Sequence, residues 1–137
     1  MIYLDNAATS FPKPECVYEE VYRCMKEYGA NPGRSGHKLS LRAGRVIYET
    51  RELLCQLFNI SNPMRLIFTS NATDSLNLAI KGVLMKGDHV ITSSMEHNSV
   101  LRPIKALEAI GVENTIARCQ KDGSISVEDI EKAIKEN

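Results

Sequence analysis

The feature that most constrains the fold is the regular alternation, from residue 65 onward, of short apolar runs with longer stretches of helical periodicity. The runs have the length and β-branched content of strands. The predicted strands are 65–69, 89–93 and 112–118. The predicted helices are 73–85, 99–110 and 127–136. Strands that alternate with helices pair in parallel through right-handed crossovers, so we expect an α/β domain with helices on both faces of the sheet.

The first half of the chain is predicted to be mostly helical. Helices are expected over 14–28 and from about 40 to 58, after a short extended segment at 2–4. The polar loop between them, GANPGRSGHK at 29–38, holds three glycines and is long enough to suggest function. We expect residues 1–13 to form a separate N-terminal segment, with 14–137 as part of one α/β domain. Three strands make a thin sheet and the chain stops on a helix, so we expect a truncated domain.

Composition and charge argue against several classes of function. Acidic and basic residues number 17 each, so the charge balance gives no reason to expect binding to nucleic acid or to an anionic membrane. No apolar run approaches the length of a membrane-spanning helix, and the N-terminus does not resemble a secretory signal. The four cysteines lack CxxC spacing. We therefore expect no metal site, and free thiols in a cytoplasmic protein.

The corner between a predicted strand and the next helix is the first candidate site. The sequence there is Ser70-Asn71-Ala72-Thr73. Ligands of α/β sheets collect where strands pass into helices, and the free N–H groups of a first helical turn bind phosphate well. Small and hydroxyl-bearing residues suit such a site. Ser, Asn and Thr are also common helix caps, so an anion site and an ordinary cap both remain open.

The three histidines differ in what their positions imply. His97 follows the end of the predicted strand 89–93, on the same rim as Thr73 if the strands are parallel. Its imidazole could stack on a flat ligand or transfer protons there, or it could be purely structural. His89 opens a strand at the opposite end and is expected to be structural. His37 lies in the glycine-rich loop, and pattern alone does not assign it.

Four motifs in this order and spacing resemble one enzyme family. They are YLDNAATS at 3–10, NPGRSGH at 31–37, IFTSNATDSLNLAIKG at 67–82 and HVITSSMEHNSVLRP at 89–103. Together they are similar to the cysteine desulfurase group of the class V aminotransferases, which use pyridoxal 5′-phosphate (PLP). The resemblance implies part of a PLP-transferase (fold type I) large domain, a three-layer α/β/α arrangement with mainly parallel strands.

The resemblance also implies roles for matching residues. Ala72 and Thr73 match the pair that holds the PLP phosphate, and Asn71 stands beside them where the family usually has glycine. His97 matches the histidine that stacks on the pyridine ring and assists proton transfer. The residues expected near the substrate are Asn6, Ala7, Ala8 and His37. The Asp74-Ser75 pair departs from the family pattern and leaves the subfamily open.

The implied reaction converts L-cysteine to L-alanine and transfers sulfur to an enzyme cysteine. The family's Schiff-base lysine, its pyridine-pairing aspartate and its persulfide cysteine all match positions beyond Asn137. We therefore expect the isolated chain to be inactive. The implied partners are a second copy of the chain and a sulfur acceptor protein. We also expect the unpaired 65–69 edge to promote self-association. The alternatives are another class V aminotransferase, a selenocysteine lyase, or a non-catalytic protein that binds a partner chain.

Overall fold

The computed structural model describes residues 2–7, 9–33 and 36–135. Within it the chain divides into two compact units, Met1–Ile67 and Phe68–Asn137. Each unit is described by itself. The predicted boundary after residue 13 separates a segment expected near the active site, not a compact unit, so the division into two units does not test it. It stays a prediction.

The first unit contains two α-helices and one turn of 3-10 helix. The helices are α1 (Glu15–Glu27) and α2 (Lys38–Phe58), and the short turn is η1 (Pro63–Arg65). Pro14 directly precedes α1, where its fixed φ suits the start of a helix. Helix α2 ends at Asn59, which adopts the left-handed conformation with φ 54°. Both helices match the predicted segments to within two residues at each end.

Tyr28 joins the two helices of this unit. Its side chain is buried, and its hydroxyl donates to Glu20 on α1. The Arg42 guanidinium of α2 lies 4.6 Å from the ring centroid and also bonds Glu27 Oε2 at 2.9 Å. The hydrogen bond to Glu20 raises the pKa of the Tyr28 phenol, because it favours the protonated form. An aromatic ring, a cation and two carboxylates therefore connect α1 to α2.

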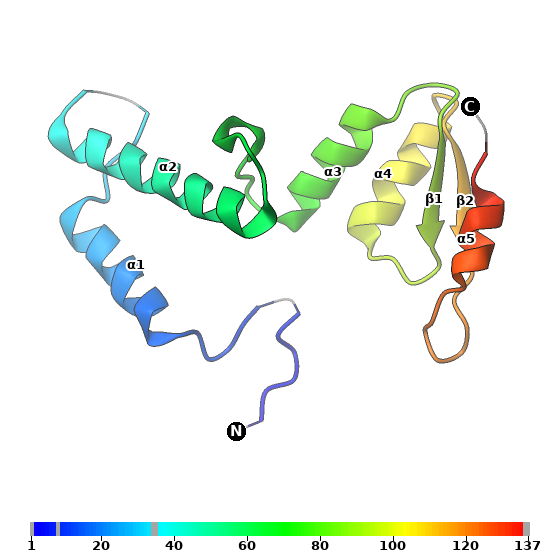
Figure 1. The fold of residues 1–137 in the computed structure, drawn as a ribbon, viewed down its shortest axis with the longest axis horizontal. Coiled ribbons are helices and arrows are strands. Elements are labelled where there is room, and N and C mark those ends of the chain that lie inside the picture. The colour runs from blue at the N-terminus through cyan, green and yellow to red at the C-terminus, as the bar shows by residue number, and fades with distance from the viewer. Residues whose placement is uncertain (1, 8, 34–35, 136–137) are drawn as a thin grey trace. The chain divides into compact units, whose positions relative to one another are not determined.

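The second unit is the α/β part. It contains α3 (Ala72–Val83), β1 (His89–Ser93), α4 (Asn98–Glu108), β2 (Glu113–Ala117) and α5 (Val127–Ala133). β1 and β2 pair in parallel, from His89 opposite Glu113 to Ser93 opposite Ala117. Helices α3 and α4 lie side by side next to the sheet, and α5 lies on its other side (Figure 1). This arrangement confirms the predicted parallel α/β architecture.

The core of this unit is small and centres on α4. Ile104 and Leu107 of that helix are buried with Val112 and Ala117 of the β2 segment. Glu108 adds a polar link: Asn114 Nδ2 donates to its Oε1 at 2.6 Å. Hydrogen bonds from Lys105 and then Asn114 hold the pKa of Glu108 below its ordinary value. The junction between α4 and β2 is therefore both apolar and charge-assisted.

Two glycines close the turns that lead into the strands. Gly87 has φ +96° and Gly111 has φ +91°, which L residues with side chains rarely adopt. The Gly87 N–H donates to the Gly111 carbonyl at 2.9 Å. A Cβ at position 111 would lie 3.1 Å from Lys86 Cγ. Each position thus needs glycine for its backbone conformation, and Gly111 also needs it for space.

The prediction of a buried strand at 65–69 is wrong. Residues 63–65 form η1, the residues that follow pair with no strand in the described part of the chain, and Ile67 is 66% exposed. Leu66 does have extended backbone, with φ −98° and ψ 120°. The apolar run therefore has strand-like backbone at Leu66, but the sheet in the described part of the chain consists of β1 and β2 and does not include it. The further expectation of self-association stays a prediction.

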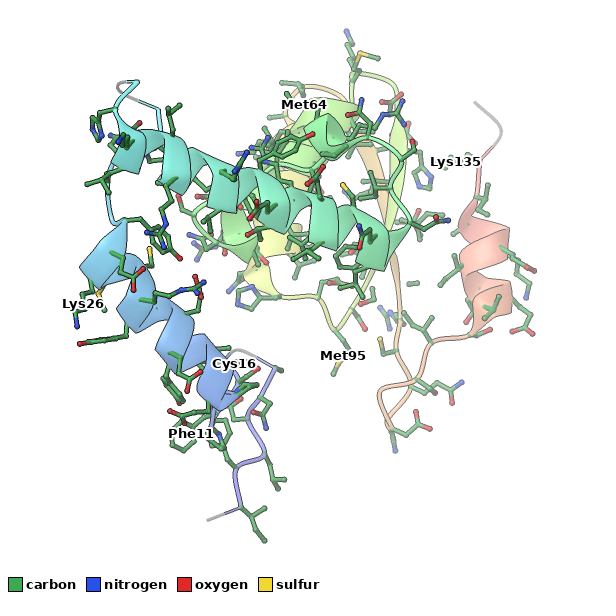
Figure 2. All side chains as sticks on the ribbon, turned by 60° about the vertical axis from the view of Figure 1, so that its left-hand side comes forward. Phe11, Cys16, Lys26, Met64, Met95 and Lys135 are labelled. Atoms are coloured by element: carbon green, nitrogen blue, oxygen red, sulfur yellow. The ribbon has the colours of Figure 1, made fainter. Side chains whose placement is uncertain are left out.

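Many large apolar side chains stay exposed in both units. Met64 and Met95, for example, are each 70% exposed (Figure 2). All four cysteines are free thiols, as predicted. In the described ranges, no helix is both long and apolar enough to cross a membrane. Nor does any group of three potential metal ligands occur among those residues.

Candidate functional site

The corner before α3 is built by hydrogen bonds among its own polar residues. Asn71 is the N-cap, and its Oδ1 accepts the Asp74 N–H at 2.9 Å. The Thr69 hydroxyl donates to the Asn71 carbonyl at 2.9 Å, and the same carbonyl accepts the Ser75 N–H at 3.2 Å. The capping interpretation of Asn71 is therefore confirmed. Its Oδ1 accepts this bond, and its amide N–H₂ group is the part of the side chain that can donate to an anion.

The cap leaves the first donors of α3 unused. Within the described residues, no acceptor lies on the N–H of Ala72 or Thr73, and the Thr73 hydroxyl has no partner. Ala72 and Thr73 are both exposed residues. Unpaired N–H groups at a helix N-terminus, with the positive end of the helix dipole, are what an anion requires. Asp74 in the same turn carries a negative charge that weakens this attraction.

The turn between β1 and α4 forms the second half of the candidate site. Ser93 ends the strand, and its hydroxyl donates to Glu96 Oε1 at 3.0 Å while accepting the Met95 N–H. His97 follows as the N-cap of α4, with its Nδ1 accepting the Ser99 N–H at 3.1 Å. A tight, internally bonded turn therefore carries the chain from the sheet to His97.

Thr73 and His97 lie at the same end of the second unit. Helices α3 and α4 both begin at the end of the sheet where β1 finishes (Figure 1). This follows from the topology, because α3 leads into β1 and α4 leads out of it. This end of the unit is the rim at which both helices start, and a shared ligand site of Thr73 and His97 there stays a prediction. His89 lies at the other end of β1, where its Nε2 is 2.8 Å from Thr115 Oγ1 on the neighbouring strand, in keeping with a structural role.

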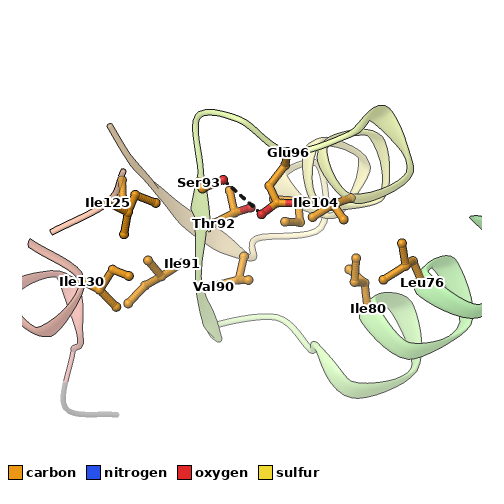
Figure 3. A pocket seen from close by; sticks show the side chains of 12 residues that line it. Leu76, Ile80, Val90, Ile91, Thr92, Ser93, Glu96, Ile104, Ile125 and Ile130 are labelled. Atoms are coloured by element: carbon orange, nitrogen blue, oxygen red, sulfur yellow. Dashed lines mark hydrogen bonds between the residues drawn. The ribbon is translucent and has the colours of Figure 1, made fainter. Parts of the chain in front are cut away.

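An apolar pocket lies beside this rim, over the sheet. Its volume is about 550 Å³. Figure 3 shows Leu76 and Ile80 of α3 facing Val90 of β1, with Ile130 of α5 on the opposite side of the strand. Only three side chains of the lining are polar, those of Thr92, Ser93 and Glu96. Such a lining suits packing of further apolar groups, and it contains no cationic side chain to hold a phosphate.

The other predicted site residues belong to the first unit. Asn6 Nδ2 donates to the Tyr3 carbonyl at 3.1 Å, and its Oδ1 accepts the Phe11 N–H at 3.0 Å. Asn6 and Ala7 are exposed, and Ala8 lies outside the described residues. His37 is the N-cap of α2, where its Nδ1 accepts the Ser40 N–H at 3.2 Å. Their place at the site stays a prediction.

One participant was missed by sequence reasoning. No role was predicted for Ser99, yet its Oγ lies 2.9 Å from His97 Nδ1 and the residue is buried. The spacing His-x-Ser at a helix start was the available signal. This spacing places the serine next to the imidazole only if His97 is the helix cap. Residue preferences do not predict a histidine cap, because caps are usually Ser, Thr, Asp or Asn.

These features define an α/β protein whose candidate ligand-binding rim is made of two helix starts at the carboxyl end of a parallel strand. A family model described as aminotransferase class-V matches residues 2–137, and the chain belongs to that family.

Two of the three similar proteins described here are cysteine desulfurases by name. Cysteine desulfurase IscS of Shewanella sediminis is 39% identical over 142 residues, covering 99% of this chain and 35% of the relative. The apo structure of a cysteine desulfurase from Thermococcus onnurineus NA1 superposes with a TM-score of 0.83 at 29% identity, covering 96% of this chain and 34% of that one. A structure of SspA in complex with cysteine gives a TM-score of 0.78 at 34% identity, covering 92% and 37%. The chain thus spans about a third of the length of the relatives it matches.

Proposed function

We propose that this chain supplies the phosphate-binding corner and the ring-facing wall of a PLP-dependent cysteine desulfurase. The observation that carries the proposal is the 39% identity, over 99% of the chain, to a relative named cysteine desulfurase IscS. The substrate of the whole protein would then be L-cysteine, with L-alanine as the product. A second copy of the chain and a sulfur acceptor protein are the partners we propose, in a cytoplasmic setting.

The residues at the α3 corner fit a phosphate group. Two backbone N–H groups, of Ala72 and Thr73, and the Thr73 hydroxyl are without partners in the described chain, and both residues are exposed. A phosphate dianion accepts several hydrogen bonds and gains from the positive end of the helix dipole. Ala72 brings no bulk beyond a methyl group, so phosphate oxygens can reach the backbone. The donor set suits the group that the family requires.

Each residue has a separate task in this proposal. Ala72 and Thr73 hold the phosphate, and the Asn71 amide N–H₂ group adds a donor beside them. His97, at the same rim, presents its ring to the flat heterocycle of the cofactor. When bound, PLP supplies an electron sink for bonds at the substrate α-carbon. Asn6, Ala7 and His37 are proposed to lie near the substrate.

The phosphate seat is tested by titrating the ¹⁵N-labelled chain with PLP and, separately, with pyridoxal. We expect PLP to move the amide signals of Ala72 and Thr73 and pyridoxal to leave them nearly unchanged. Thr73→Val removes one hydrogen bond to a charged group, which is worth about 1.5 kcal/mol or more, so affinity for PLP should fall about tenfold.

The matched control is Thr50→Val. The Thr50 hydroxyl donates to the Val46 carbonyl within α2, at 2.8 Å, so its loss should leave PLP affinity unchanged. Equal shifts with PLP and pyridoxal, or equal affinity of Thr73→Val and the parent chain, would contradict the proposed seat. Alanine release from cysteine by the pure chain would separately contradict the expected inactivity of residues 1–137.

A further inference from the structure

The side chain of His97 is held at one of its two nitrogens. Its Nδ1 lies 3.1 Å from the Ser99 backbone nitrogen and 2.9 Å from Ser99 Oγ. Ser99 is 7% exposed, whereas His97 is on the surface. A single buried serine therefore contacts the ring twice, through its backbone and through its hydroxyl.

The chemistry of the two contacts fixes where the protons lie. A backbone N–H can only donate, so the N–H of Ser99 requires an unprotonated Nδ1. A hydroxyl next to that same lone pair must then donate as well. A neutral imidazole with an unprotonated Nδ1 carries its proton on Nε2. The other tautomer would place two hydrogens between Nδ1 and the Ser99 nitrogen.

We propose that Ser99 is a positioning residue that fixes His97 as the Nε2–H tautomer. Nε2 lies across the ring from Nδ1, so this N–H is directed away from the first turn of α4. Neutral His97 then offers the rim a hydrogen-bond donor and no acceptor.

The use of this donor by a bound ligand rests on the proposed function, but the hydrogen-bond arrangement does not. A ligand group that accepts at Nε2, such as the phenolate or carboxylate oxygen of a cofactor–substrate complex, is favoured over one that donates. Ser99 would act through His97 and would not itself touch the ligand.

His37 shows that the hydroxyl contact is not a by-product of capping by histidine. It caps α2 through the same Nδ1, which accepts the Ser40 N–H at 3.2 Å. The hydroxyl of Ser40 instead donates to the Asn31 carbonyl at 2.8 Å. Both histidines accept a backbone N–H at Nδ1, His97 from the second residue after it and His37 from the third. Only Ser99 also brings its hydroxyl to the ring, so Ser40 serves as a control.

The experiment is ¹⁵N NMR of the imidazole groups in residues 1–137, without cofactor, at a pH where the shifts report neutral rings. For His97 we expect a pyridine-type Nδ1 and a pyrrole-type Nε2. Ser99→Ala should move the His97 Nδ1 signal downfield, because a pyridine-type nitrogen that loses a donor shifts in that direction. Ser99→Cys, which keeps a weaker donor of similar size, should fall between the two.

Ser40→Ala should leave the Nδ1 signal of His37 and that of His97 in place. A pyrrole-type Nδ1 at His97 in the parent chain would overturn the assignment. So would a His97 Nδ1 signal that is unchanged in both Ser99 variants. Neither outcome depends on PLP binding, so failure here is distinct from failure of the proposed function, which the PLP titration reports.

Discussion

Replacing Asn71 with alanine tests whether the corner before α3 is held by its cap. The Asn71 Oδ1 accepts the Asp74 N–H at 2.9 Å, and alanine removes that acceptor. Loss of an N-cap side chain costs between about 0.5 and 2 kcal/mol. The site is exposed, so water partly replaces the lost bond, and we expect a cost of about 1 kcal/mol.

Amide hydrogen exchange measures this cost locally. A loss of about 1 kcal/mol corresponds to roughly fivefold faster exchange, which should appear first at Asp74 and Ser75. Asn77→Ala is the matched control in the same helix, since the Asn77 side chain only donates to the Thr73 carbonyl at 3.0 Å. It should leave the Asp74 amide as slow as in the parent chain. Unchanged exchange in Asn71→Ala would refute the capping argument.

Two further predictions concern packing within each unit. Hydrogen bonds from Lys105 and then Asn114 lower the pKa of Glu108, so this carboxylate binds fewer protons in the folded state than in the unfolded state. The ionised carboxylate therefore stabilises the folded state above about pH 4.5, and this contribution is lost as the pH falls through the folded pKa. In Glu108→Gln, denaturant unfolding should lose that part of its acid sensitivity, and an unchanged pH profile would contradict this. Arg42→Lys keeps the charge but loses the planar stack on Tyr28, so the free energy of unfolding should fall by about 0.5–1 kcal/mol. An unchanged free energy of unfolding in both Arg42→Lys and Arg42→Ala would count against this.

The sequence predicted the second unit well because its signals are local. β1 at 89–93 has the predicted bounds, and β2 at 113–117 lies within one residue of them. Ser126 caps α5, which starts at the predicted residue 127, and its Oγ accepts the Asp129 N–H at 3.3 Å. Apolar spacing, a glycine stop and a capping residue are each properties of a few neighbouring residues, so they can be read without the fold.

The prediction failed where a segment needs a neighbouring strand from another part of the chain, and where a helix begins with an unusual capping residue. The run at 65–69 has the composition of a buried strand, but composition cannot supply the neighbouring strand that would bury it. The two histidine caps moved the starts of α2 and α4 to Lys38 and Asn98, one or two residues before the predicted ones. Imidazole Nδ1 replaces the usual oxygen acceptor there, which residue preferences do not anticipate.

The two glycine turns also bear on how this gene can vary. Every missense change reachable by one nucleotide from a glycine codon introduces a Cβ atom. At Gly87 and Gly111 the fold requires a positive φ, which a residue with a Cβ atom rarely adopts. At Gly111 the added atom would also lie close to the Lys86 side chain. Gly82 has open space around the same atom and is not among the described glycines with positive φ. Random mutation would therefore be purged at codons 87 and 111 and accepted at codon 82, so glycine content alone misstates where the chain is fragile.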